Sequence, residues 1–117
     1  MKEMSGDLVR LHPIKNCISD MENMLNGVDE DTFYRNNEKK YATERLLEII
    51  GEAVNKISGE TLLKSKNAIP WRDIIDFRNL ITHEYFRIDY TMVYKIATEE
   101  IPVVKQEVEY LIAELSK

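Results

Sequence analysis

Four polar side chains that could carry out chemistry lie close together in the segment RNLITHEY, residues 78–85: Arg78, Asn79, His83 and Tyr85. Imidazole titrates near neutral pH, so His83 could act as a general base or a general acid. Arg78 offers a permanently charged guanidinium that matches two phosphate oxygens, as a lysine would not. These groups suit cleavage of RNA without a metal ion, in which a base takes the proton of the ribose 2′-OH and a cation stabilises the charged phosphorane.

The spacing of these residues restricts how they can work together. Asn79 could orient His83 or donate to a phosphate, and Tyr85 could bind a phosphate, stack on a base or be a modification site. Arg78 and His83 are five residues apart, which separates them by about 140° around a continuous helix. A joint site requires the helix to end or distort near His83, or a second copy of the domain to bring its own pair alongside. The same residue types also serve as capping and dipole partners at helix ends, which is the alternative to catalysis.

The elements that must position these residues are all helical. Apolar residues recur at helical spacing, and no segment alternates polar and apolar residues for long enough to form a strand. The pattern predicts a helix from Ile14, with Pro13 at its start or kinking it, and an end at Asn26-Gly27. The next prediction is a short helix that opens with the acidic run 29–31. The further predictions are helices over residues 42–57 and 70–81, with Pro70 at a first position, a helical turn or loop over 60–69, and a last helix with Asp89 as N-cap and a kink at Pro102.

These elements predict an all-α bundle of four main helices plus short helical turns, forming a single domain over residues 1–117. The net charge of -5 argues against a protein that holds nucleic acid by bulk positive charge, so a local site would be needed. Residues 61–90 carry five basic against four acidic side chains and are the least acidic part of the chain.

Cysteine and histidine usage points to a metal-free protein of a reducing compartment. Cys17 is the only cysteine, which excludes an intrachain disulfide and a cysteine zinc cluster. His12 and His83 are the only histidines, so a multi-histidine metal site is hard to build, and no cofactor is expected. No apolar stretch is long enough to span a bilayer, and the first residues have neither a basic n-region nor an apolar h-region. We therefore expect a cytoplasmic protein.

A resemblance to a known family rests on three segments of the chain. The segment IPWRDIIDFRNLITHEYFRIDY, residues 69–90, resembles the signature of the HepT-like family of HEPN domains, formerly the DUF86 family. LEIIGEAVNKIS at residues 47–58 and TEEIPVVKQEVEYL at residues 98–111 resemble the second long helix and the final helix of that family. Its motif of Arg, four residues, His, one residue and Tyr is complete as Arg78, His83 and Tyr85, and Asn79 supplies the usual polar residue after the arginine.

The resemblance implies a HEPN-type toxin of a toxin–antitoxin system, which forms a homodimer and cleaves RNA as a metal-independent endoribonuclease. Arg78 and His83 would be the catalytic residues and Asn79 and Tyr85 the supporting ones, with the paired motifs lining a cleft at the dimer interface. The family's partner is a minimal nucleotidyltransferase antitoxin of the MntA type, and the resemblance implies that it adds AMP to Tyr85.

A different class of function fits the same resemblance. The chain could be a non-catalytic helical partner, or a substrate-presenting subunit, of a minimal nucleotidyltransferase, which would need the same interface but not His83. Asp76 and Glu84 also depart from the family pattern, in which glycine is commoner beside the motif. These acidic neighbours would weaken phosphate binding or reflect another RNA preference.

Overall fold

The computed structural model describes the backbone of residues 2–65 and 69–117, and the side chains of these residues except 2–5, 69, 70 and 85. Its main helices are α1 (Lys2–Leu25), α3 (Asn37–Asn55), α5 (Ile69–His83) and α7 (Ile101–Leu115). The short elements are α2 (Glu30–Arg35), α4 (Gly59–Leu62), the 3-10 turn η1 (Tyr85–Arg87), α6 (Tyr90–Lys95) and the π-helical turn η2 (Ile96–Glu100). No strand occurs in the described residues, so the predicted all-α class is confirmed.

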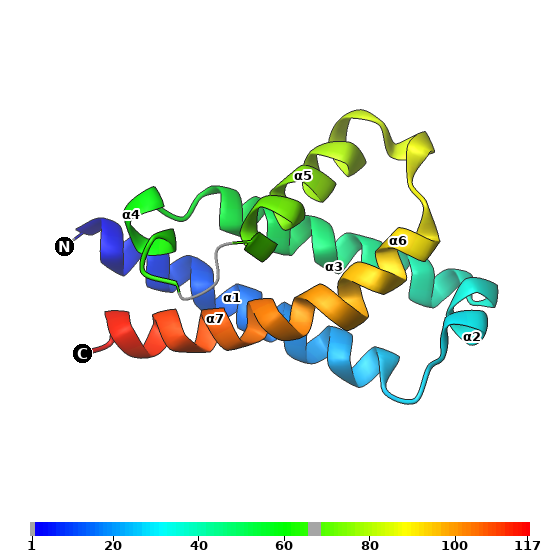
Figure 1. Ribbon diagram of the computed structural model, residues 1–117, viewed down its shortest axis with the longest axis horizontal. Coiled ribbons are helices and arrows are strands. Elements are labelled where there is room, and N and C mark those ends of the chain that lie inside the picture. The colour runs from blue at the N-terminus through cyan, green and yellow to red at the C-terminus, as the bar shows by residue number, and fades with distance from the viewer. Residues whose placement is uncertain (1, 66–68) are drawn as a thin grey trace.

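The long helices α1, α3 and α7 form the body of the molecule, which measures 46 × 30 × 20 Å (Figure 1). α1 packs against both α3 and α7, and α3 also packs against α5. The two termini lie at the end that carries α4, and α2 closes the opposite end. α5 runs obliquely away from this body, so that its C-terminal end and η1 stand out from it. The candidate motif is therefore carried on the most protruding helix of the bundle.

A single apolar core joins the long helices. A large aliphatic or aromatic side chain that is fully buried stabilises a fold by roughly 1.5–3 kcal/mol relative to an exposed one. The largest of the fully buried side chains are Phe33, Leu11, Ile14, Ile18, Met21, Leu47, Ile50, Ile74, Ile101 and Leu111.

Among the described residues, no helix is long and apolar enough to cross a membrane.

Side-chain caps begin several of the helices, as the sequence predicts. The Asp29 carboxylate accepts a hydrogen bond from the Thr32 N–H at 2.8 Å, and Asp89 accepts one from the Thr91 N–H at 2.9 Å. These bonds satisfy amide groups that have no partner in the first turn of a helix. Gly27 has a φ of 74°, in the left-handed region, and follows the end of α1. The predicted cap at Asp89, the predicted helix start at the acidic run 29–31 and the predicted end of the first helix are thus confirmed.

The start of the first helix is predicted wrongly. α1 begins at Lys2 rather than at Ile14, and Pro13 lies inside it. A proline in a helix interior removes a hydrogen bond, but Leu11 and Ile14 on either side of it are both fully buried. Buried Asp7 also ties this first half of α1 to the start of α4, by accepting hydrogen bonds from Ser58 and Thr61. These tertiary contacts offset the missing bond.

The predicted irregularity near Pro102 takes the form of the π-helical turn η2. The N–H of Ile101, directly after this turn, donates to the carbonyl of Ile96, five residues earlier. Proline cannot donate to the carbonyl four residues before it, which favours a rearranged turn at this point. η2 joins α6 to α7 and places Glu100 next to α5.

Candidate active site

α5 carries Arg78, Asn79 and His83, and it ends two residues beyond the predicted end at residue 81. His83 is the last residue of the helix, and the N–H of Glu84 closes its final turn by donating to the carbonyl of Leu80 at 2.8 Å. The His83 side chain is exposed. His83 is thus open to solvent at the free end of α5.

Arg78 has the opposite environment, because it faces α3. A Cβ built on Gly51 of α3 would lie 2.4 Å from the Cβ of Arg78 and 3.0 Å from its Cγ. Only a glycine leaves room for α5 to approach α3 this closely. The stem of Arg78 is held in this contact, and the side chain is 24% exposed.

Two oxygen atoms hold the guanidinium of Arg78. Its Nη1 donates to Oδ1 of Asn79 at 3.0 Å, and its Nη2 donates to Oε1 of Glu52 at 3.4 Å. Nε of Arg78 is buried and has no hydrogen-bond partner among the described residues. The Glu52 side chain is 48% exposed, and ion pairs this open to solvent are worth roughly 0–1 kcal/mol. A phosphate could therefore displace Glu52 at little cost.

The structure brings Arg78 and Asn79 together but not Arg78 and His83. α5 remains helical through His83, so the angle of about 140° between the two side chains persists. Asn79 accepts a hydrogen bond from Arg78, a contact that neither of its two sequence-based roles includes. Tyr85 begins η1, directly after the end of α5, and its side chain lies outside the described residues. Within one chain, Arg78 and His83 therefore lie on different sides of α5.

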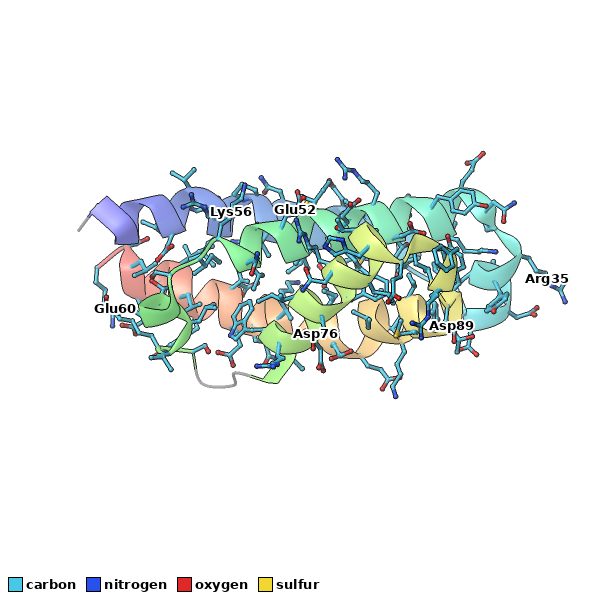
Figure 2. All side chains as sticks on the ribbon, turned by 90° about the horizontal axis from the view of Figure 1, so that it is seen from above. Arg35, Glu52, Lys56, Glu60, Asp76 and Asp89 are labelled. Carbon is cyan, nitrogen blue, oxygen red and sulfur yellow. The ribbon has the colours of Figure 1, made fainter. Side chains whose placement is uncertain are left out.

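The two acidic neighbours of the motif lie in different surroundings. Glu84 pairs with Arg87 of η1 at 3.1 Å. Asp76 lies at a pocket between α5, α6 and η2. Figure 2 marks Glu52 on α3 beside α5, and Asp76 on α5 itself. The described side chains contain no group of three His, Cys, Asp or Glu residues that could hold a metal ion.

Two residues that contact Arg78 are missed by the sequence reasoning. Gly51 makes the close approach of the helices possible, and Glu52 holds the guanidinium. A glycine in the middle of a helix costs about 0.5–1 kcal/mol relative to alanine, so Gly51 carries a signal of close packing. Glu52 carries no such signal, because an exposed glutamate is typical of a helix surface.

Comparison with known proteins gives one family and several relatives. Residues 14–111 match the family model described as Ribonuclease HepT-like. The chain is 37% identical to "Putative RNase MJ1380" of Methanocaldococcus jannaschii over 85% of this chain and 90% of that protein. It is 36% identical to "Putative RNase MJ0125" of the same organism, over 92% and 91% of the two chains. It is 31% identical to "Probable ribonuclease HepT" of Thermococcus cleftensis, over 86% and 91%. No solved structure gives a significant match.

Proposed function

The chain belongs to the ribonuclease HepT-like family, and from this premise we propose that it is an endoribonuclease that cleaves RNA without a metal ion. The observation that carries the proposal is the complete motif over the end of α5 and the start of η1, with Arg78 held beside α3 and His83 exposed at the helix end. Both lie within the residues that match the family.

The chemistry follows from the two side chains. Neutral His83 takes the proton of a ribose 2′-OH, and the 2′-oxygen attacks the adjacent phosphorus. The bond to the 5′-oxygen breaks, that oxygen takes up a proton, and a 2′,3′-cyclic phosphate remains. Arg78 donates to the phosphate oxygens and stabilises the charge that builds up on them. Asn79 holds the guanidinium that does so.

We propose that two copies of the chain form this site. Arg78 and His83 of one chain point to different sides of α5, so each copy would supply groups that the other lacks at a shared cleft. The protruding end of α5 is accessible for such pairing (Figure 1).

The proposed partner is a minimal nucleotidyltransferase antitoxin that transfers AMP to Tyr85. The tyrosyl oxygen would attack the α-phosphorus of ATP, with loss of its proton and release of pyrophosphate. AMP on Tyr85 would add bulk and negative charge two residues from His83 and would block RNA. Intact mass measurement of protein co-expressed with the transferase tests this, and an unmodified Tyr85 in a neutralised complex would contradict it.

The test of the nuclease is incubation of the purified protein with total RNA in excess EDTA. Arg78→Ala and His83→Ala should each abolish cleavage while the protein stays folded. His12→Ala, which changes an exposed histidine of α1, is the matched control and should cleave normally. Cleavage that persists in both motif variants would show that the mechanism is wrong. Absence of cleavage by every form, with binding to the transferase retained, would favour the non-catalytic partner instead.

A further inference from the structure

A pocket of about 420 Å³ lies on α5, beside α6 and η2. This volume is in the lower part of the range of small-molecule sites. Its floor is apolar and its rim is charged. The floor consists of Phe77, Leu80, Met92 and Ile96, and the rim consists of Asp73, Asp76, Lys95 and Glu100.

The position of the pocket relates it to the motif. Leu80 and His83 are three residues apart on α5, so they occupy neighbouring turns of one face, with a rise of about 4.5 Å between them. Asp76 is seven residues from His83, which is two turns on the same face. The side of α5 that holds Arg78 faces α3 instead. A nucleotide whose base enters the pocket would therefore place its ribose or the adjacent phosphate close to the imidazole of His83.

The chemistry of the rim selects among possible occupants. Ionised carboxylates only accept hydrogen bonds, so they favour a ligand edge that carries N–H donors and repel a phosphate. Guanine presents two neighbouring donors, N1–H and the N2 amino group, which match one carboxylate. Uracil presents a single N–H between two carbonyl oxygens. These oxygens would face the carboxylates of the rim, and two acceptors repel each other. The apolar floor offers a surface on which a base can lie. Lys95, on the same rim, could pair with the phosphate that follows.

We propose that this pocket binds a guanine base of single-stranded RNA, so that cleavage takes place beside guanosine. The RNA part of this inference rests on the proposed ribonuclease function, whereas guanine binding does not.

Two of the three carboxyl groups of the rim, those of Asp73 and Glu100, make ligand binding depend on pH. Burial raises the pKa of Glu100 to about 7, and its hydrogen bond with Asp73 and the charges of Asp73 and Glu99 act in the same direction, against Lys95. Asp76 is a further carboxylate at the same pocket. Asp73 and Glu100 thus share one proton near neutral pH. When guanine binds, its own N–H groups would donate to these carboxylates in place of that proton. Guanine affinity should fall as the pH drops below about 7.

The direct test is titration of the whole protein with guanosine 3′-monophosphate, with uridine 3′-monophosphate as the comparison probe. We expect the guanosine nucleotide to bind about tenfold more tightly, since one well-matched pair of base contacts is worth roughly 1–3 kcal/mol. Asp73→Asn and Glu100→Gln should each remove that preference. Glu99→Gln changes an exposed neighbour outside the pocket and should keep it.

The outcomes separate this inference from the proposed function. Equal binding of the two nucleotides, binding of neither, or a preference that Asp73→Asn leaves intact would overturn the guanine pocket, whatever the nuclease assay with His83→Ala shows. A guanosine preference that depends on Asp73, in a protein that cleaves no RNA, would support the pocket and contradict the nuclease. Sequencing of the cleaved ends should show that the wild type cuts beside guanosine and that Asp73→Asn cuts without this preference.

Discussion

Gly51 of α3 lies so close to Arg78 of α5 that a single added methyl group would collide with the arginine stem. The same methyl group would lie 3.1 Å from the backbone oxygen of Ile74. The arginine Cβ and the Ile74 carbonyl are parts of the helix itself, so they cannot swing aside as the tip of a flexible side chain could. The position of Arg78, the candidate group for binding phosphate, is therefore set by Gly51 on another helix.

Gly51→Ala should move α5 and lower both stability and RNA cleavage. Alanine gains about 0.5–1 kcal/mol in helix propensity, but overpacking costs roughly 1–3 kcal/mol, so we expect a net loss. Urea unfolding measures the stability, and a cleavage assay measures the activity. Gly59→Ala is the control, because a Cβ there meets no atom within 4 Å. A variant of Gly51 as stable and as active as the wild type would contradict the close approach.

Glu52→Gln should strengthen RNA binding. It removes the carboxylate that holds Nη2 of Arg78 and that competes with phosphate. We expect a gain of up to about fivefold in affinity, since exposed ion pairs are worth roughly 0–1 kcal/mol, and the gain should shrink at high salt. Binding is measured in a His83→Ala background, so that the RNA stays intact. Glu48→Gln, which breaks the pair with Arg45 on the same helix, controls for net charge. Weaker binding after Glu52→Gln would mean that Glu52 positions Arg78 instead of competing.

Asp7→Ala should destabilise the fold, because Asp7 is 2% exposed and accepts hydrogen bonds from the N–H and the hydroxyl of Ser58 and from Thr61. We expect a loss of roughly 2–3 kcal/mol in the free energy of unfolding, whereas Asp20→Ala on the exposed side of α1 should cost little. Burial opposes ionisation of Asp7, but these hydrogen bonds outweigh it and lower its pKa below 3.8. Its contribution is therefore present above that pH and lost as the pH falls through the lowered pKa.

Glu100→Gln should change how stability depends on pH between about 4.5 and 7. Burial and Asp73 raise the pKa of Glu100 from 4.5 to about 7, so the folded chain holds this proton more tightly than the unfolded chain does. The stabilisation is complete below 4.5 and is lost as the pH rises to about 7. Urea unfolding, followed by the fluorescence of buried Trp71, should show a smaller decline for the variant than for the wild type. An unchanged decline would contradict the shared proton, and Glu99→Gln should leave the decline in place.

Local features of the fold could be predicted from the sequence because neighbouring residues determine them. Asp29 and Asp89 cap the amides of residues that directly follow them, and Gly27 adopts its left-handed conformation at the end of its own helix. The wrong start of α1 has a distant cause. Pro13 is a local signal against a helix. The hydrogen bonds that help to overcome it join Asp7 to Ser58 and Thr61, which lie more than fifty positions further along the chain.

The candidate site likewise has some features that the sequence predicts and others that depend on distant contacts. The order and spacing of Arg78, Asn79 and His83 are visible in the sequence, and the predicted end of their helix at residue 81 is two residues short of the observed one. The ion pair between Arg78 and Glu52 joins residues 26 positions apart, and the pocket needs α5 to meet α6 and η2. Those relationships depend on how the helices pack, which helical periodicity alone does not determine.

The π-helical turn η2 holds one residue more than an α-helical path would need, and that extra residue makes this part of the chain sensitive to its length. Each residue of a regular helix turns by about 100°. Deleting one residue between Ile96 and Glu100 would let α6 and α7 run on as a single regular helix, and would swing Met92 and Lys95 around its axis by about that angle. The loss of a single codon would thus erase the pocket beside α5 while leaving every residue of the motif in place.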